Sequence, residues 1–167
     1  DKKFKYFSLR YFNVLGADKK LRYGPIGFKI KSFSNNLYKS IILNKDFKIY
    51  GNNHKTPDGT AVRDFIHVDD LADIHYEALN YLKKNKINQI CNCGYGKAYS
   101  IYQLIEIVLK KRELNFNFSF TKKRPGDISY MVADVTKLKK ILNWKPKHSS
   151  IKKMIFSELK WKNKIFK

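Results

Sequence analysis

The residues of this sequence best suited to bind a charged small molecule are two arginines with an aspartate close to one of them. Arg63 stands inside a strand-like run of seven residues, and Arg124 lies three positions before Asp127 in an expected loop. An arginine fork suits bidentate recognition of phosphate, and a nearby aspartate can bind a sugar hydroxyl. The alternative is that Arg63–Asp64 and Arg124–Asp127 are salt bridges, and the residues alone leave both interpretations open. Asn13, which directly follows two aromatic residues, is a further polar candidate.

Local motifs for catalysis are absent from the sequence. No tyrosine is followed by a lysine four positions later, and neither a P-loop nor a zinc-binding spacing occurs. Gly94-Tyr95-Gly96 begins like a dinucleotide fingerprint, but Tyr99 occupies the third glycine position, which favours a structural turn. The histidines do not pair at helical ligand spacing, so we expect no metal site, and we interpret His67 as a packed or capping imidazole at a strand end. The histidines are His54, His67, His75 and His148.

Composition indicates a folded domain. The chain has 167 residues, of which 43% are hydrophobic and 15% aromatic, and disordered chains lack both classes. No apolar run reaches the roughly 18 residues that span a bilayer. The sequence opens without an initiator Met or a signal-peptide core, as though cut from a longer protein. Cys91 and Cys93 lie in an expected strand, where we expect them on opposite faces or one of them in the core; a disulfide is then implausible, and a reducing, cytoplasmic setting fits.

The charge balance is strongly basic. The formal net charge is +21, which taken alone suggests nucleic acid or an anionic membrane as a partner. Most of the basic residues are lysines scattered over every segment, with no stripe interleaved with aromatic residues. We therefore favour a solvated basic surface and expect neither nucleic acid nor membrane as a partner. A basic binding module stays the alternative from another functional class.

Hydrophobic periodicity predicts alternating strands and helices, which is the α/β class. Residues 16–31 read as a long loop of the kind that is usually functional. Asp69 or Asp70 is expected to cap the second helix, Ser100 and Gln103 to form a capping box, and Thr136 to cap a short helix. The expected strands cover 4–14, 48–50, 62–68, 87–92 and 115–121, and the expected helices cover about 34–44, 69–82, 101–109, 136–142 and 150–164.

Three segments carry a family resemblance. Leu9 to Val14 with Gly16-Ala17 resembles the "LRYFN..GA" strand of the extended short-chain dehydrogenase/reductase family. Thr56 to Asp73 is similar to the "T.DGT..RD(Y/F)IHV.DLA" segment of UDP-glucose 4-epimerases. Arg124-Pro125-Gly126-Asp127, followed by Ala133-Asp134 and Leu142-Asn143-Trp144, matches the late motifs of those enzymes in order and spacing. The resemblance runs from about Phe7 to Lys147.

The resemblance implies a UDP-sugar site. Arg63 and Arg124 would clamp the diphosphate, Asp127 would bind ribose, and Asn13 would bind the diphosphate or sugar. Tyr50 falls where the family places an aromatic ring against uracil. Met131 falls where the family limits the room beside the sugar, which suggests plain hexoses. Two further pairs complete the implied set: Asn36 and Leu37, at the start of a helix, would touch the pyrophosphate and nucleotide, and Tyr11 and Phe12 would stand at the nicotinamide side.

The resemblance also implies what this chain lacks. The NAD-binding loop and the catalytic Tyr-x-x-x-Lys of the family precede the matching segment, so no catalytic residue is expected here and the chain alone should be inactive. The fold would be a substrate-binding subdomain plus the last strands of an NAD-binding Rossmann-like sheet, at 4–14 and 87–94, with apolar faces exposed where the amino-terminal half is missing. The implied whole enzyme interconverts UDP-glucose and UDP-galactose through oxidation at C4 by NAD, as a homodimer. Another UDP-sugar epimerase or a dehydratase of the same family is the alternative.

Overall fold

The computed structural model describes residues 4–27, 31–111 and 114–166 and confirms the mixed α/β class. The strands in these ranges form four small sheets. Three are parallel pairs, β1–β6, β2–β5 and β3–β8, and the fourth has the order β7-β4-β9, in which β4 runs parallel to β9 and antiparallel to β7. The strands are β1 (Phe7–Tyr11), β2 (Asn13–Leu15), β3 (Phe47–Tyr50), β4 (Val62–Arg63), β5 (Phe65–His67), β6 (Gln89–Cys93), β7 (Tyr99–Ser100), β8 (Phe118–Thr121) and β9 (Tyr130–Met131).

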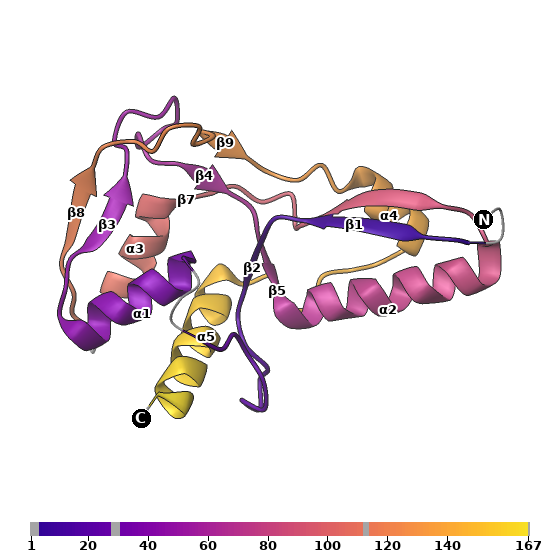
Figure 1. Ribbon diagram of the computed structural model, residues 1–167, viewed down its shortest axis with the longest axis horizontal. Coiled ribbons are helices and arrows are strands. Elements are labelled where there is room, and N and C mark those ends of the chain that lie inside the picture. Colours follow the sequence, from indigo (N-terminus) through magenta and orange to yellow (C-terminus); the bar gives the residue numbers. More distant parts are fainter. Residues whose placement is uncertain (1–3, 28–30, 112–113, 167) are drawn as a thin grey trace.

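The molecule is elongated and has two ends, joined by the β2–β5 pair (Figure 1). The sheet half contains β1 and β6 with α2 (Val68–Asn85) along one face and α4 (Thr136–Leu142) beside it. The pocket half contains α1 (Phe33–Leu43), α3 (Ile101–Leu109) and α5 (Ile151–Ile165) with the remaining sheets. The amino terminus lies at the end of the sheet half and the carboxyl terminus at the end of α5 in the pocket half.

The expected strand at 4–14 is two strands. β1 and β2 are separated at Phe12, and they pair with different partners, β6 and β5. β1 is also less buried than its composition suggests, since Tyr11 is 53% exposed. A parallel strand is normally covered on both faces, and here only one face has a helix against it. Similarly, the expected extended run 62–68 divides into β4 and β5, and Val68 already belongs to α2.

The expected cap is confirmed for α3 and wrong for α2 and α4, whereas all three helices begin within one residue of the expected start. Ser100 and Gln103 form the expected capping box of α3, and Ser150 accepts a hydrogen bond from the Lys153 N–H at the start of α5. The α2 cap is His67, whose Nδ1 accepts the Asp69 N–H, in place of the expected Asp69 or Asp70. The α4 cap is Val135 without a side-chain bond, in place of Thr136.

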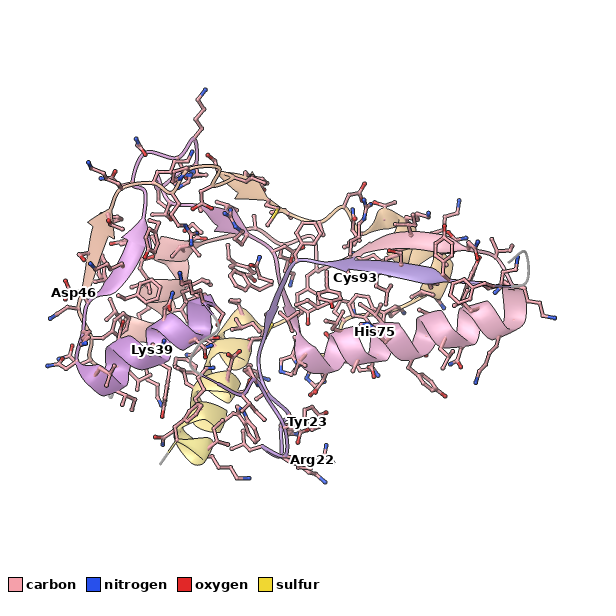
Figure 2. The ribbon with its side chains drawn as sticks, viewed as in Figure 1. Arg22, Tyr23, Lys39, Asp46, His75 and Cys93 are labelled. Atoms are coloured by element: carbon pink, nitrogen blue, oxygen red, sulfur yellow. The ribbon has the colours of Figure 1, made fainter. Side chains whose placement is uncertain are left out.

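The two cysteines point the same way. Cys91 and Cys93 alternate with Asn92 in β6, so both side chains enter the core, and both are free thiols. The expectation of opposite faces was wrong because side chains two residues apart lie on one face of a strand. Burial raises the pKa of Cys93 to about 12. Figure 2 shows Cys93 on the sheet half, and Arg22 with Tyr23 at the far tip of the loop between β2 and α1.

Residues 16–27 have no regular structure, as expected for the long loop, and 28–30 lie outside the described residues. The loop starts tightly: Gly16 has φ of +100°, and a Cβ there would lie 2.5 Å from His67 Cδ2. No helix in the described ranges is long and apolar enough to cross a membrane.

Candidate functional site

A cavity of about 350 Å³ opens in the pocket half. Its walls come from segments far apart in the sequence: the break between β1 and β2, the first turn of α1, the end of β3, β4 and the loop before β9. The lining includes seven of the ten residues implied by the family resemblance, which are Phe12, Asn13, Asn36, Tyr50, Arg63, Arg124 and Asp127. Tyr11, Leu37 and Met131 are not among the lining residues.

One carboxylate joins the two arginines of the cavity. Arg63 Nη2 donates to Asp127 Oδ1 over 3.0 Å, and Arg124 donates to Asp127 Oδ2 from Nε and Nη2 over 3.2 and 3.0 Å. Of the two salt bridges weighed from sequence, Arg124–Asp127 exists, and Arg63 pairs with Asp127 as well. Asp64 cannot share that pairing, because it is fully buried and accepts the backbone N–H groups of Tyr95, Gly96 and Ala133.

The two arginines differ in exposure. The Arg63 side chain is 12% exposed and that of Arg124 is 58% exposed. Burial lowers the pKa of the Arg63 guanidinium from its ordinary value, and the nearby charge of Asp127 acts in the opposite direction. Arginine stays charged across the physiological range. The site therefore has one fixed buried cation and one exposed cation that can move, with one carboxylate between them.

An aromatic ring lies beneath the exposed arginine. The Arg124 guanidinium is 4.7 Å from the centre of the Tyr50 ring, which is 37% exposed. Tyr50 ends β3, and alternation along β3 places Lys48 on the same outward side, also in the cavity lining. A guanidinium over an aromatic face is a favourable cation–π contact. The same face could stack a planar heterocycle if Arg124 moved toward a phosphate.

The first turn of α1 forms another wall of the cavity. Ser32 caps the helix through the Asn35 N–H, and Lys31, Ser32, Ser34 and Asn36 line the cavity. The Asn36 N–H is already bonded to the Ser32 carbonyl over 3.0 Å, so only the exposed side chain of Asn36 remains for a ligand. Leu37 is fully buried in the core and does not line the cavity.

The remaining implied residues lie around the junction of the two halves. Asn13 Nδ2 donates to the Asp64 carbonyl over 3.0 Å, which fixes its amide beside the cavity. Tyr11 lies outside the cavity and contacts His75 of α2, with ring centres 6.2 Å apart. Met131 is in register with Arg63 across the β4–β9 pair, so it neighbours the arginine along the sheet.

Sequence reasoning missed the apolar floor of the cavity. Phe33, Phe47, Ala61, Phe65 and Ile101 line it together with the polar residues. Each lies in or beside a helix or strand whose periodicity marks it as a core position. Periodicity cannot tell which core residues border a cavity, because that depends on how distant elements pack.

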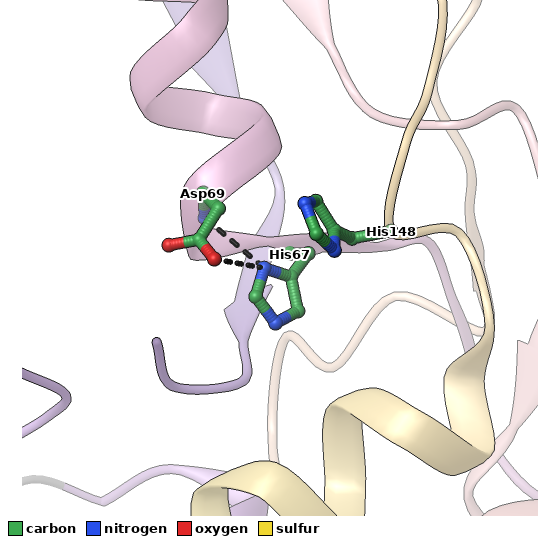
Figure 3. Close-up of side chains that lie close together, drawn as sticks. All are labelled: His67, Asp69 and His148. Carbon is green, nitrogen blue, oxygen red and sulfur yellow. Dashed lines mark hydrogen bonds and ion pairs between the residues drawn. The ribbon is translucent and has the colours of Figure 1, made fainter. Parts of the chain in front are cut away.

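The sequence also gave no sign of a cluster at the junction. His67, Asp69 and His148 offer ligand atoms within 4.8 Å of one another (Figure 3). His67 Nδ1 already accepts the Asp69 N–H, and the His67 and His148 rings stack with centres 4.9 Å apart. Lone pairs of an imidazole lie in the ring plane, so stacked rings do not direct them at one point. A helix cap and a ring stack account for the cluster, and they agree with the capping role expected of His67.

Comparison with known proteins gives matches along nearly the whole chain. The family model described as NAD dependent epimerase/dehydratase family matches residues 1–94. A UDP-glucose 4-epimerase of Lactobacillus helveticus is 35% identical over 158 residues, which are 94% of this chain and 48% of that protein. The chain thus spans about half the length of the curated relatives it matches.

Solved structures give the same result. The UDP-glucose-4-epimerase from Stenotrophomonas maltophila with bound NAD and formylated UDP-arabinopyranose superposes with a TM-score of 0.91 at 29% identity, covering 98% of this chain and 49% of that one. The UDP-glucose 4-epimerase from Bifidobacterium longum in complex with NAD+ and UDP superposes with a TM-score of 0.86 at 33% identity, covering 99% and 49%.

Proposed function

Because this chain belongs to the NAD dependent epimerase/dehydratase family, we propose that it is the part of an NAD-dependent UDP-glucose/UDP-galactose 4-epimerase that holds the UDP-sugar. The observation that carries the proposal is the meeting of Arg63 and Arg124 at one cavity, with Tyr50 beneath the second arginine. Two arginines beside an aromatic face suit a nucleoside diphosphate, since the guanidinium groups can bind the phosphates and the aromatic ring can stack on the base.

The arginine–carboxylate arrangement supports a specific way of binding. A diphosphate entering the cavity would take the Arg63 and Arg124 hydrogen bonds that Asp127 now accepts. The released Asp127 carboxylate can accept hydrogen bonds from ribose hydroxyl groups, and the uncovered Tyr50 ring can stack on uracil. The side chains of Asn13 and Asn36 and the positive end of α1 would complete the contacts to the diphosphate and sugar.

NAD is the cofactor of the proposed reaction and would be held mainly by a preceding segment. In such an enzyme NAD takes a hydride from C4 of the sugar and returns it to the other face. The residues here fit one edge of that cofactor: Phe12 lines the cavity at the carboxyl end of β1, and the adjacent Tyr11 presents an open ring. The contribution of this chain is positioning, because it holds UDP while the sugar reacts.

The sheet half supports the proposal that an NAD-binding half precedes this segment. β1 and β6 form a parallel pair with exposed apolar side chains, and parallel sheets are normally larger and covered on both faces. We propose that residues 4–14 and 87–94 complete the sheet of that half and that the whole enzyme is a cytoplasmic homodimer. The two buried thiols suit such a reducing compartment.

The identity of the sugar is the finer question. Met131 beside Arg63 favours a plain hexose over an N-acetylated one, as the resemblance implies. The ligand of the Stenotrophomonas structure, a formylated UDP-arabinopyranose, favours the alternative of another UDP-sugar epimerase of the same family. Turnover of UDP-galactose compared with UDP-arabinopyranose, after co-expression with a matching NAD-binding half, decides between them.

Titration calorimetry of the 167-residue chain with UDP tests the nucleotide site. We expect Arg63→Ala to weaken UDP binding about 10- to 100-fold, the range expected from losing charge-assisted hydrogen bonds. Arg22→Ala is the matched control, because Arg22 is exposed at the tip of a loop away from the cavity and is paired with Asp18 (Figure 2). Unchanged binding in Arg63→Ala, or tighter binding of single-stranded DNA than of UDP, contradicts the proposal and favours a basic binding module.

A further inference from the structure

An ion pair is buried inside the pocket half, on α5. Glu158 and Lys162 lie one helical turn apart, and their side chains are 3% and 1% exposed. Lys162 Nζ is 3.2 Å from Glu158 Oε1. Two buried charges are commonly no more stabilising than two well-packed apolar residues, so such a pair suggests a role in holding a geometry.

The hydrogen-bond partners of the pair lie just after β2 and in the first turn of α1. Glu158 Oε2 accepts the Gly16 N–H over 2.9 Å, and Glu158 Oε1 accepts the Ser34 hydroxyl. Lys162 Nζ donates to the Asn35 side-chain carbonyl. The pair therefore ties the end of β2 to the start of α1, at the two ends of the long loop.

Neighbouring residues of α5 hold the loop between these ends. Ser157 Oγ accepts the Ala17 N–H over 3.2 Å, and the Trp161 indole N–H donates to the Pro25 carbonyl over 3.0 Å. Lys164 Nζ donates to the Leu21 carbonyl over 2.7 Å. Side chains of α5 thus bond to the loop at Gly16, Ala17, Leu21 and Pro25. Glu158 and Lys162 are the buried members of this set.

The supported turn of α1 is the one that forms a wall of the cavity. Ser34 bonds to Glu158 and also lines the cavity, while Asn35 bonds to Lys162 and lies next to Asn36. A helix N-terminus binds an anion only if its N–H groups and dipole point at it, so a small rotation of the first turn would misdirect them.

We propose that Glu158 and Lys162 are positioning residues for the phosphate side of the nucleotide site. They hold the first turn of α1, from behind, in the orientation that presents it to the diphosphate. This inference rests on the proposed function, and it goes beyond it by assigning a role to a buried pair that does not itself line the cavity. The expected consequence is selective: loss of the pair weakens binding of the phosphates and spares binding of the nucleoside.

The test compares the wild-type chain with Glu158→Gln, Lys162→Met and the double variant Glu158→Met/Lys162→Met. Calorimetry gives the affinities for UDP and for uridine, and thermal unfolding gives Tm. Both single variants should lower Tm, because each leaves a buried polar group without its partner. The double variant removes both buried charges, but Gly16, Ser34 and Asn35 lose their partners, so its Tm should also lie below that of the wild type. It should bind UDP about tenfold more weakly than the wild type, with unchanged affinity for uridine. Lys160→Met, at an exposed position of the same helix, should change none of these values.

A second measurement keeps the inference testable without UDP. Backbone amide exchange of peptides that cover Gly16-Ala17 and residues 32–36 should be faster in the double variant than in the wild-type chain, with unchanged exchange in α3. If the double variant folds, binds UDP as the wild type does and exchanges at the wild-type rate, the pair serves stability alone and the inference is wrong. If the wild-type chain does not bind UDP, the proposed function fails, and amide exchange alone decides whether the pair holds the turn.

Discussion

The two halves of the molecule differ in how far they are completed by their own side chains. In the pocket half, Arg63 and Arg124 both pair with Asp127 at the cavity. The buried Glu158–Lys162 pair has three hydrogen-bond partners within the chain, which are Gly16, Ser34 and Asn35. In the sheet half, two parallel strands carry Tyr11 and Ile90 at 53% and 43% exposure, and Tyr76 and Leu79 of α2 are exposed too. The side chains of the cavity are thus paired within the chain, whereas the parallel strands of the sheet half carry exposed apolar side chains. This difference supports the proposals that the pocket half binds the nucleotide and that another segment covers the sheet half.

The largest expected effect comes from the residue that joins the halves. Asp64 is fully buried, and its carboxylate accepts the N–H groups of Tyr95, Gly96 and Ala133. Asp64→Ala leaves these donors unsatisfied, and at about 1–3 kcal/mol for each we expect a loss of about 4 kcal/mol or more. Urea unfolding measures the loss of free energy of unfolding. A variant that shows no cooperative unfolding transition would also agree with the prediction. Asp73→Ala, which removes the exposed ion pair between Asp73 of α2 and Lys147, should cost less than about 1 kcal/mol. Similar values for both variants would mean that the halves are not joined through Asp64.

The next largest effect is the difference in stability loss between two apolar substitutions, one in each half. Leu104 of α3 is fully buried, whereas Ile90 of β6 is 43% exposed. We expect Leu104→Ala to lower the free energy of unfolding by about 3 kcal/mol, because it leaves a cavity in a packed core. Ile90→Ala should lower it by less than about 1 kcal/mol. If both substitutions cost the same in urea unfolding, the open face of the sheet half is covered in solution, for example by a second copy of the chain, and the contrast between the halves disappears.

Sequence patterns predicted the parts of the fold that are locally encoded. The Thr56 to Gly59 turn forms as expected: Gly59 has φ of +74°, and Asp58 Oδ1 accepts the Thr60 N–H over 2.9 Å. The capping box of α3 and the apolar face of α5 are equally local. These features need only residues within four positions of one another, so the spacing of residue types is sufficient to reveal them.

Features that depend on distant partners were predicted incompletely or not at all. The motifs marked Arg63 and Arg124 as a pair, and the structure does bring them to one cavity, but the sequence could not tell that a single carboxylate, Asp127, joins them. The buried pair Glu158–Lys162 looks like an ordinary exposed i,i+4 pair until its contacts with the loop are known. The predicted burial of β1 was too high. The apolar content of a strand shows that it can pack against another element, but it does not show whether the chain supplies that element.

The smallest effect concerns the junction itself, and it is a pH dependence. His67 caps α2 through Nδ1 and stacks on His148. Burial lowers the pKa of His67 below its ordinary value of 6.5; the charges of Asp69 and Asp70 act against burial, and that of His148 acts with it. The unfolded chain therefore binds a proton at His67 before the folded chain does, so the stabilisation is complete above pH 6.5 and is lost as the pH falls toward the folded pKa.

Urea unfolding between pH 5 and pH 8 checks this sign. Stability should fall with decreasing pH by at most about 1.4 kcal/mol per unit from this one group. In His67→Asn, which retains a side-chain oxygen for the helix cap, the slope below pH 6.5 should be smaller by up to that amount. The slope is the decisive quantity, because the loss of ring packing on Gly16 changes the stability of the variant at every pH. An equal slope of stability against pH in both proteins would mean that His67 is not shielded from solvent. The solvent exposure of the sheet half would then include the junction between the two halves.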